Sequence, residues 1–354
     1  MQRLRATGTL SSVRVPLALL LSTLAACSLA AGEVGVAESA VIYGEDERRD
    51  LFETRDLDLV EIGERSVAAL VQRAQVSVRG GEVLLGSGGT LDESIVRDTG
   101  VPLCPDERFR DQPTVAYCTG TLIDDDLVLT AAHCVPLERF CADTSFVFRF
   151  YNEGPGRLAP IGLGDVYDCM GIEAISWLRD VAVLRLDRPV EGDLTPLDIR
   201  PEGRPFDPGD PVFLAGFPLG VPMKTAVGQA GGPVDTESTA FYADVLNGSS
   251  GSAVLDARGR VAAVVSRSQV ESLERTRDEC IATTRLDEGE GAGEIAGYVY
   301  RPLAELCDAG KGSERLCAQV SCPECGGGCS AAPPGPACAL ALAWFALRRR
   351  RRPA

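Results

Sequence analysis

Short apolar runs, many of them β-branched, recur along the middle of this 354-residue chain and are separated by Gly, Pro and Asp. From Ser66 onward they include Val67–Val71, Leu127–Leu129, Phe146–Phe148, Val181–Leu184, Val212–Leu214 and Val261–Val265. Runs of this length between turn residues predict short antiparallel strands, and therefore an all-β barrel or sandwich. No long helical periodicity interrupts them, and only Pro302–Ala309 is predicted as a short closing helix.

The composition changes on both sides of this region. Residues 33–65 are dense in charge, with Glu45–Asp50 at their centre, and are interpreted as a pro-segment or an extended N-terminal arm. Residues 66–306 are predicted to form the folded domain. Residues 307–336 are rich in Cys, Gly and Pro and have little capacity for a core, which predicts a stalk.

The first 32 residues have the pattern of a signal peptide. Three arginines precede the apolar stretch Val15–Ala26, and a signal of this kind is removed from the mature protein. The stretch ends Leu24-Ala25-Ala26-Cys27, which resembles a lipobox in which Cys27 would be acylated. Ordinary cleavage nearby, after Ala30-Ala31, is the equally supported alternative.

Residues 337–354 carry a second export-related pattern. The apolar segment Ala337–Leu347 is followed by Arg348–Arg352, and eleven apolar residues are too few for a membrane span of roughly 20 residues. With the preceding pair Gly328-Cys329, the tail resembles the myxobacterial-type C-terminal sorting signal. A marginal tail anchor is the alternative, and both predict a protein held at the cell surface.

Charge and cysteine content restrict the function further. Residues 1–32 and 330–354 carry eight arginines and no acid, so removing them from a chain of net charge −16 leaves −24. Such an acidic body would repel phosphate backbones, which argues against nucleic-acid binding. Thirteen cysteines indicate an oxidising, exported location, and with one histidine in the chain we expect neither a metal nor another cofactor.

That single histidine, His133, is the candidate base, because imidazole exchanges a proton near neutral pH. It follows the predicted strand Leu127–Thr130, and a Cys118–Cys134 disulfide would clamp its loop. Asp180 precedes the apolar run Val181–Leu184 and is the candidate carboxylate, since a buried acid at such a position needs a partner.

The candidate nucleophile is Ser250, in the sequence Asn247-Gly248-Ser249-Ser250-Gly251-Ser252. Gly248 would let its own N–H and that of Ser250 point together at a developing oxyanion. A Gly/Ser hairpin turn is the simpler alternative for this loop taken alone. The G-x-S-x-G elbow of α/β-hydrolases does not fit, because Ser252 occupies the last glycine position.

The strings CTGTLI…TAAHC, DVAVL and GSSGS, in this order, resemble the chymotrypsin-like serine peptidases, in particular the bacterial branch with glutamyl endopeptidases. Val41–Arg48 and Gly216–Lys224 resemble the same branch. The resemblance spans about residues 41–303 and implies two perpendicular six-stranded antiparallel barrels with the site between them. It implies the catalytic triad His133, Asp180 and Ser250, with Gly248 in the oxyanion hole.

The chain departs from the family pattern at several positions. Ser249 stands where the animal enzymes carry the Asp that pairs with a freed N-terminus, and Val265 stands where glutamyl-specific members place a pocket His. Asp244, six residues before Ser250, would favour a basic substrate side chain. Arg267, next to Ser266, would favour an acidic one, and the sequence leaves both possibilities open.

Ten cysteines remain when Cys27, Cys329 and Cys338 are set aside as processed or membrane-facing. We expect the pair Cys118–Cys134, and we give Cys141–Cys169, Cys104–Cys280 and Cys307–Cys317 as further hypotheses. The acidic loop Asp287–Glu294 is interpreted as solvated, with calcium ligation as the alternative. The resulting prediction is a surface-tethered, monomeric serine endopeptidase acting on proteins or peptides. The alternative is a catalytically silent, protease-like binding module.

Overall fold

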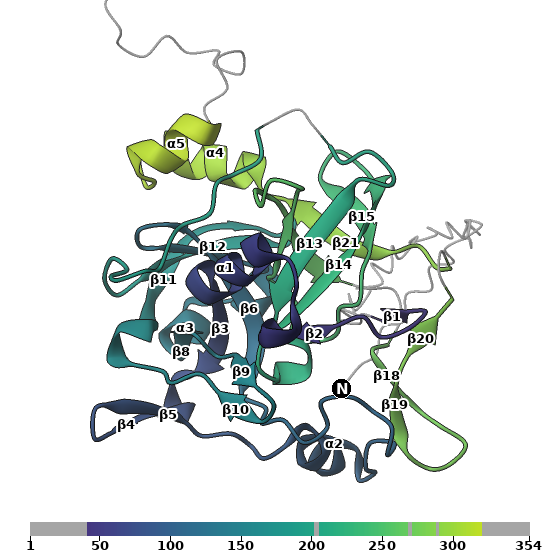
Figure 1. Cartoon of the computed structure of the whole chain (residues 1–354). Coiled ribbons are helices and arrows are strands. Elements are labelled where there is room, and N and C mark those ends of the chain that lie inside the picture. Colours follow the sequence, from purple (N-terminus) through teal and green to yellow (C-terminus); the bar gives the residue numbers. More distant parts are fainter. Residues whose placement is uncertain (1–40, 202–204, 268–270, 288–289, 321–354) are drawn as a thin grey trace, which may run out of the picture. The chain divides into compact units, whose positions relative to one another are not determined.

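The computed structural model describes residues 41–201, 205–267, 271–287 and 290–320 (Figure 1). The predicted signal peptide, the sorting tail and residues 321–336 of the predicted stalk lie outside these ranges. Within them, no helix combines the length and the apolar character needed to cross a membrane.

Six antiparallel strands close into the first barrel, in the order β11-β12-β7-β6-β3-β8. Its interior is filled by large apolar side chains such as Leu70, Leu122 and Phe146, all fully buried. Every residue of β7 and β8, and every residue of β3 except Gln72, is buried, so both faces of these strands are covered and the sequence shows continuous apolar runs. The strands are β3 (Val67–Gln72), β6 (Ala116–Asp124), β7 (Leu127–Thr130), β8 (Thr144–Phe148), β11 (Val166–Ser176) and β12 (Val181–Leu186).

A second ring of six strands runs β13-β16-β17-β21-β15-β14 and closes through the pairing of β14 with β13. Phe241, Val254 and Val265 lie in its own separate core. The prediction of an all-β fold with two six-stranded antiparallel barrels is thus confirmed. The strands are β13 (Pro211–Gly216), β14 (Lys224–Pro233), β15 (Ser238–Tyr242), β16 (Ala253–Leu255), β17 (Val261–Arg267) and β21 (Glu294–Tyr298).

Several smaller elements lie outside the two barrel sheets. The short pairs are β4 (Val76–Arg79) with β5 (Glu82–Leu85), β9 (Asn152–Gly154) with β10 (Arg157–Leu158), and β18 (Leu273–Arg275) with β19 (Ile281–Thr283). The helix α2 (Leu91–Thr99) begins at a capping box of Thr90 and Glu93, a signal that our sequence analysis missed. Its residues Leu91 and Ile95 pack against Val221 and Ile281. The helix α3 (Glu138–Ala142) follows the turn that carries His133.

The N-terminal segment is built into the fold. Within the predicted arm, β1 (Ile42–Tyr43) pairs with β20 (Arg285–Leu286), and β2 (Arg49–Asp50) extends the second barrel beside β14. The helix α1 (Leu57–Ser66) then leads directly into β3 and lies near β6 in Figure 1. Folded structure therefore starts well before residue 66.

It also continues past residue 306. The predicted closing helix is α4 (Tyr300–Asp308), and α5 (Glu314–Val320) follows it (Figure 1). Leu316 and Val320 of α5 join the core of the first barrel, and the Cys307–Cys317 disulfide ties the two helices together. Residues 307–320 are therefore part of the packed domain, because a short amphipathic helix supplies the apolar surface that the Cys/Gly/Pro composition hid.

A glycine of β21 marks a close approach between the barrels. A Cβ on Gly297 would lie 1.8 Å from the carbonyl oxygen of Arg179, the residue before Asp180. We expect Gly297→Ala to lower the free energy of unfolding by about 1–3 kcal/mol, because the backbone must shift.

The matched control is Gly171→Ala on β11, where a Cβ meets no atom within 4 Å. It should change stability by no more than about 0.5 kcal/mol. Urea denaturation followed by circular dichroism measures both variants, and equal stabilities would contradict the close contact.

Candidate active site

Strand pairing brings His133 and Asp180 together. Thr130 of β7 lies opposite Ala182 of β12 in the antiparallel register. His133 comes three residues after Thr130, and Asp180 two residues before Ala182, so both side chains emerge at the same end of the strand pair. The imidazole Nδ1 lies 2.6 Å from Oδ2 of Asp180.

The Asp180 carboxylate is enclosed by donors. Its Oδ1 accepts the backbone N–H of His133 at 2.9 Å, and its Oδ2 also accepts the hydroxyl of Ser266 at 2.7 Å. The carboxylate side chain is only 15 % exposed, and Asp180 adopts φ +53°, a left-handed conformation that costs free energy in a non-glycine residue. Because Nδ1 faces an anion, the proton sits on Nδ1, and Nε2 is the basic nitrogen.

Ser266 has a different place from the one that we expected. Sequence reasoning put it in the specificity pocket, whereas its hydroxyl points at the carboxylate behind the imidazole. Ser266 lies on β17, and β17 pairs with β16, the strand that directly follows the serine loop, with Ala253 opposite Val264. This pairing brings Ser266 close to the site. No local signal at Ser266 could reveal this contact, since it joins residues 86 positions apart.

The loop of Ser250 lies against the strands that lead to His133. A Cβ on Gly251, which has φ +88°, would lie 2.1 Å from the Thr119 carbonyl oxygen and 2.3 Å from Oγ1 of Thr130. Only glycine fits at this position, and the Ser250 carbonyl accepts the Thr119 N–H at 2.8 Å. These backbone contacts fix the serine loop against the ends of β6 and β7.

The peptide bond before Gly248 is oriented by a hydrogen bond from the Phe217–Gly220 loop. The Leu219 N–H donates to the Asn247 carbonyl, which turns that oxygen toward the Phe217–Gly220 loop. The N–H of Gly248, on the other side of the same trans peptide, therefore points the opposite way. Across the described ranges, neither this amide nor that of Ser250 donates to a protein acceptor.

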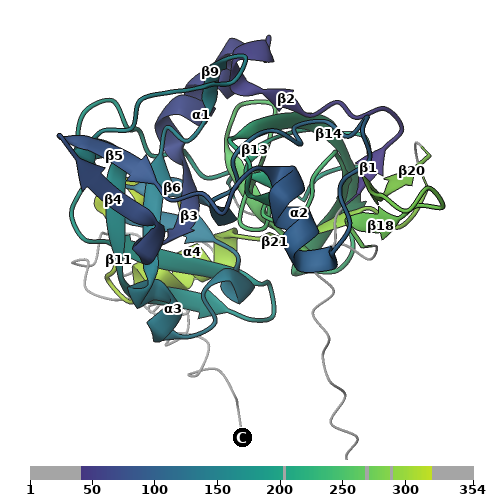
Figure 2. The same cartoon turned by 90° about the horizontal axis from the view of Figure 1, so that it is seen from below.

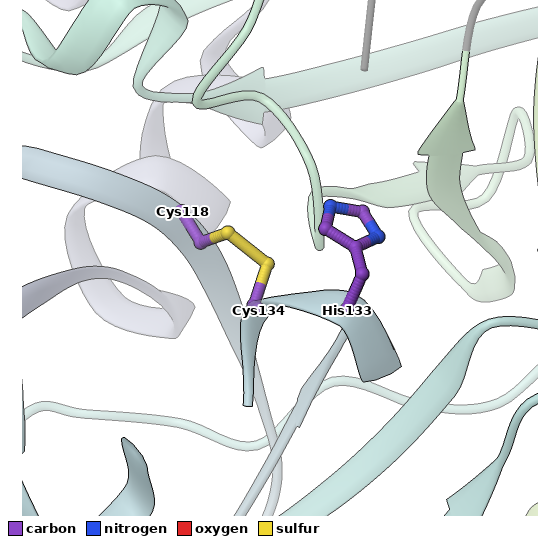
Figure 3. A group of neighbouring side chains, drawn as sticks. All are labelled: Cys118, His133 and Cys134. Carbon is purple, nitrogen blue, oxygen red and sulfur yellow. A yellow bond between two sulfur atoms is a disulfide. The ribbon is translucent and has the colours of Figure 1, made fainter. Parts of the chain in front are cut away.

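A disulfide borders the site. Figure 3 shows His133 and Cys134 projecting from one short turn, η3 (Ala132–Cys134), with Cys134 bonded to Cys118 of β6. Potential ligand atoms of Cys118, His133 and Cys134 lie within 4.8 Å of one another. Both sulfurs are consumed by the disulfide, so the group has no thiolate to offer a metal. The structure also contains the three other pairings that we suggested.

Asp244, one of the two candidate specificity residues, is buried and already occupied. Its two carboxylate oxygens accept the backbone N–H groups of Tyr43 and Glu47 at 2.8 and 2.7 Å. Burial raises the pKa of Asp244, although these two hydrogen bonds act in the opposite direction. Arg267, the other candidate, ends β17 with an exposed side chain.

Glu294 is a second buried carboxylate near the N-terminal segment, and our sequence analysis did not single it out. It is fully buried at the start of β21 and accepts the Val41 N–H at 3.3 Å. We had assigned it to a solvated acidic loop. The loop that precedes it lies partly outside the described residues, and calcium ligation there is not tested.

Residues 118–264 match the family model of the trypsin-like peptidase domain. The matched segment contains His133, Asp180 and Ser250, and it extends from β6 of the first barrel into β17 of the second. Among solved structures, the chain is similar to one described as "Structure of Glu endopeptidase in complex with MPD". That similarity has a TM-score of 0.44 and 16 % identity, and it covers 77 % of this chain and 99 % of the other.

The disulfide beside the imidazole should contribute strongly to stability. Replacing both Cys118 and Cys134 by Ser opens a link between residues 16 positions apart and should cost about 3 kcal/mol of unfolding free energy.

Equilibrium urea unfolding of the oxidised wild type and the double variant measures the difference. The matched control removes the Cys307–Cys317 bridge, which lies between α4 and α5 and away from His133. Only the Cys118/Cys134 variant should also loosen the turn that carries His133. Full retention of stability in this variant would contradict the prediction.

Proposed function

We propose that the protein is a serine endopeptidase that cleaves peptide bonds through His133, Asp180 and Ser250. The observation that supports this most is the 2.6 Å contact of the imidazole Nδ1 with a carboxylate that three donors enclose. It stands beside a glycine-bounded serine loop whose two neighbouring amides are available to an oxyanion. The family match over residues 118–264 supports the same reaction class.

In this proposal Ser250 Oγ attacks the carbonyl carbon of the scissile peptide bond, and Nε2 of His133 takes the hydroxyl proton. The negative charge that develops on the carbonyl oxygen is stabilised by the N–H groups of Gly248 and Ser250. The imidazolium returns its proton to the leaving amine, which leaves an acyl group on Ser250. Water then repeats the sequence, while Asp180 holds the ring and stabilises its positive charge.

The single histidine allows a direct test of this mechanism. Ser250→Ala and His133→Ala should each lower kcat by roughly 10⁶, and the double variant should lose little more, because the two groups act as one unit. The acidic limb of the activity–pH profile should disappear with His133, since the chain has no other imidazole.

Activity is followed with a quenched fluorescent peptide library, and active sites are counted with a fluorophosphonate. Ser252→Ala is the matched control, because it removes a hydroxyl from the same loop. If folded wild type takes up no label at Ser250, the chain is instead a silent protease-like binding module.

We further infer that Asp244 does not select a basic substrate side chain, because both of its oxygens already accept hydrogen bonds from Tyr43 and Glu47. Arg267 is then the better candidate for contact with the substrate, and it would favour acidic side chains. The body is acidic and disulfide-bonded, which supports export. Tethering at the cell surface through the termini and a monomeric state complete the proposal.

The two candidate residues make opposite predictions for specificity. Asp244→Asn should leave the ratio of kcat/KM for Glu and Lys substrates unchanged, at a stability cost of about 1–3 kcal/mol for the lost acceptor. Arg267→Ala should lower the Glu-to-Lys ratio by roughly tenfold, the effect of one charge-assisted hydrogen bond. Matched peptide pairs measure both ratios, and a change confined to Asp244→Asn would reverse the assignment.

A further inference from the structure

A buried lysine lies outside the groups used so far. Lys224 begins β14, and its side chain is 1 % exposed. Its ammonium lies 2.8 Å from Oδ1 of Asp50, 2.7 Å from Oε1 of Gln112 and 2.5 Å from the carbonyl oxygen of Pro222. An ammonium has three N–H donors, so these three contacts use all of them.

The acceptors of this ammonium come from separate parts of the chain. Asp50 belongs to the N-terminal segment, and its oxygens also accept the side-chain amides of Asn152 at 3.0 Å and Gln112 at 2.9 Å. Asn152 lies in β9, between strands of the first barrel, whereas Lys224 lies in the second. The Lys224–Asp50 pair therefore joins the N-terminal segment to both barrels at one buried point.

An aromatic ring completes the arrangement. The face of Phe109 lies 4.5 Å from Lys224 Nζ, and the guanidinium groups of Arg48 and Arg108 lie 5.2 and 4.6 Å from the same ring centre. Phe109 adopts φ +62°, an unfavourable conformation for an aromatic residue. Asp46 forms ion pairs with both Arg48 and Arg108. We call Arg48, Asp50, Phe109, Gln112 and Lys224 the lysine cluster.

The lysine cluster reaches the oxyanion hole through one loop. Lys224 donates to the carbonyl oxygen of Pro222, which is the last residue of the segment Phe217–Pro222. Within this segment, the N–H of Leu219 donates to the Asn247 carbonyl and orients it. The start of the segment is fixed by the Phe217 N–H, which donates to Oγ1 of Thr119 at 3.2 Å. Lys224 thus fixes the end of the loop that sets the direction of the Gly248 N–H.

The choice of lysine at this position is informative. The chain contains two lysines, Lys224 and Lys311, and thirty-three arginines. A guanidinium keeps its proton at every accessible pH, whereas a buried ammonium is compact and can lose its proton. Lys224, which joins the N-terminal segment to both barrels, can therefore also lose its proton.

We propose that Lys224 is a positioning residue of the peptidase site, whose charged ammonium holds the Phe217–Pro222 loop and the N-terminal segment so that the Gly248 N–H faces the oxyanion. This inference rests on the proposed function. Lys224 touches no reacting atom and acts through Pro222, Leu219 and Asn247.

The protonation of Lys224 gives the positioning role its own signature. Burial lowers the pKa of Lys224 to about 8, with a smaller lowering by Arg48, whereas Asp50 and Glu53 raise it. Above pH 8 the ammonium loses a proton and one of its three contacts, so kcat/KM should fall. Between pH 8 and 10.5 the unfolded chain holds more protons than the folded chain, so the Lys224 contribution to stability rises with pH. Activity and this contribution therefore change in opposite directions.

The test compares wild type, Lys224→Met and Lys224→Arg, with Lys311→Met as the matched control on the surface. We expect Lys224→Met to lower kcat/KM roughly 10²-fold, the scale of a misplaced catalytic group, and to abolish the alkaline limb. Lys224→Arg should recover part of the activity and show no alkaline limb near pH 8. Lys311→Met should retain the wild-type profile.

A direct measurement does not depend on the Lys224 variants folding. In protein labelled with ¹⁵N-lysine, two side-chain signals are expected, and Lys311→Met assigns them. The Lys224 signal should titrate near pH 8 together with the alkaline limb. A Lys224 signal without a transition near pH 8, or an unchanged limb in Lys224→Met, would overturn the proposal. Absence of fluorophosphonate labelling in wild type would instead remove the proposed function, while the titration would still report on the cluster.

Discussion

The Asp180 carboxylate is the group on which the arrangement of this molecule depends. An acid that is mostly buried is stable only when donors surround it, and here three donors come from two distant places in the chain. The backbone and ring of His133 arrive at the end of β7, and the hydroxyl of Ser266 arrives on β17 of the other barrel. This anion therefore links the end of β7 to the residue that precedes β12, and it contacts β17 of the second barrel, which lies beside the first (Figure 2).

Polar groups also fix the N-terminal segment, which differs in character from the barrels. The barrel cores are apolar. Residues 41–54, in contrast, are held by buried charged side chains, some of the segment itself and some of the second barrel. Asp244 and Glu294 accept its backbone amides, and Lys224 binds its Asp50. A buried ion pair adds less to stability than an apolar contact of the same size, but its directed contacts exclude other registers. The charge density of this segment thus reflects specific internal pairing, in addition to solubility.

The short apolar runs predicted an all-β barrel or sandwich, and the resemblance to the chymotrypsin-like peptidases implied two six-stranded barrels. Strands such as β7 and β8 are buried on both faces, and this leaves short apolar runs between turn residues that can be counted along the chain. Strings such as TAAHC and GSSGS are local patterns of residue types, so His133 and Ser250 could be proposed as base and nucleophile without coordinates. The same reasoning failed for residues 41–65 and 307–320, where charge or Cys/Gly composition suggested an arm and a stalk. In both cases the buried partners lie in distant strands, so the local composition gave no sign of them.

By itself, the sequence predicted an all-β fold, a candidate nucleophile, base and carboxylate, and an oxidising location, because each prediction depends on residue type and local spacing. Tertiary structure alone decided that Ser266 donates to Asp180, that Asp244 accepts amides of the N-terminal segment, and that Lys224 pairs with Asp50. These contacts join residues from 86 to 201 positions apart. Only the closure of the two barrels brings such residues together, and no local pattern encodes which distant group will satisfy a buried charge.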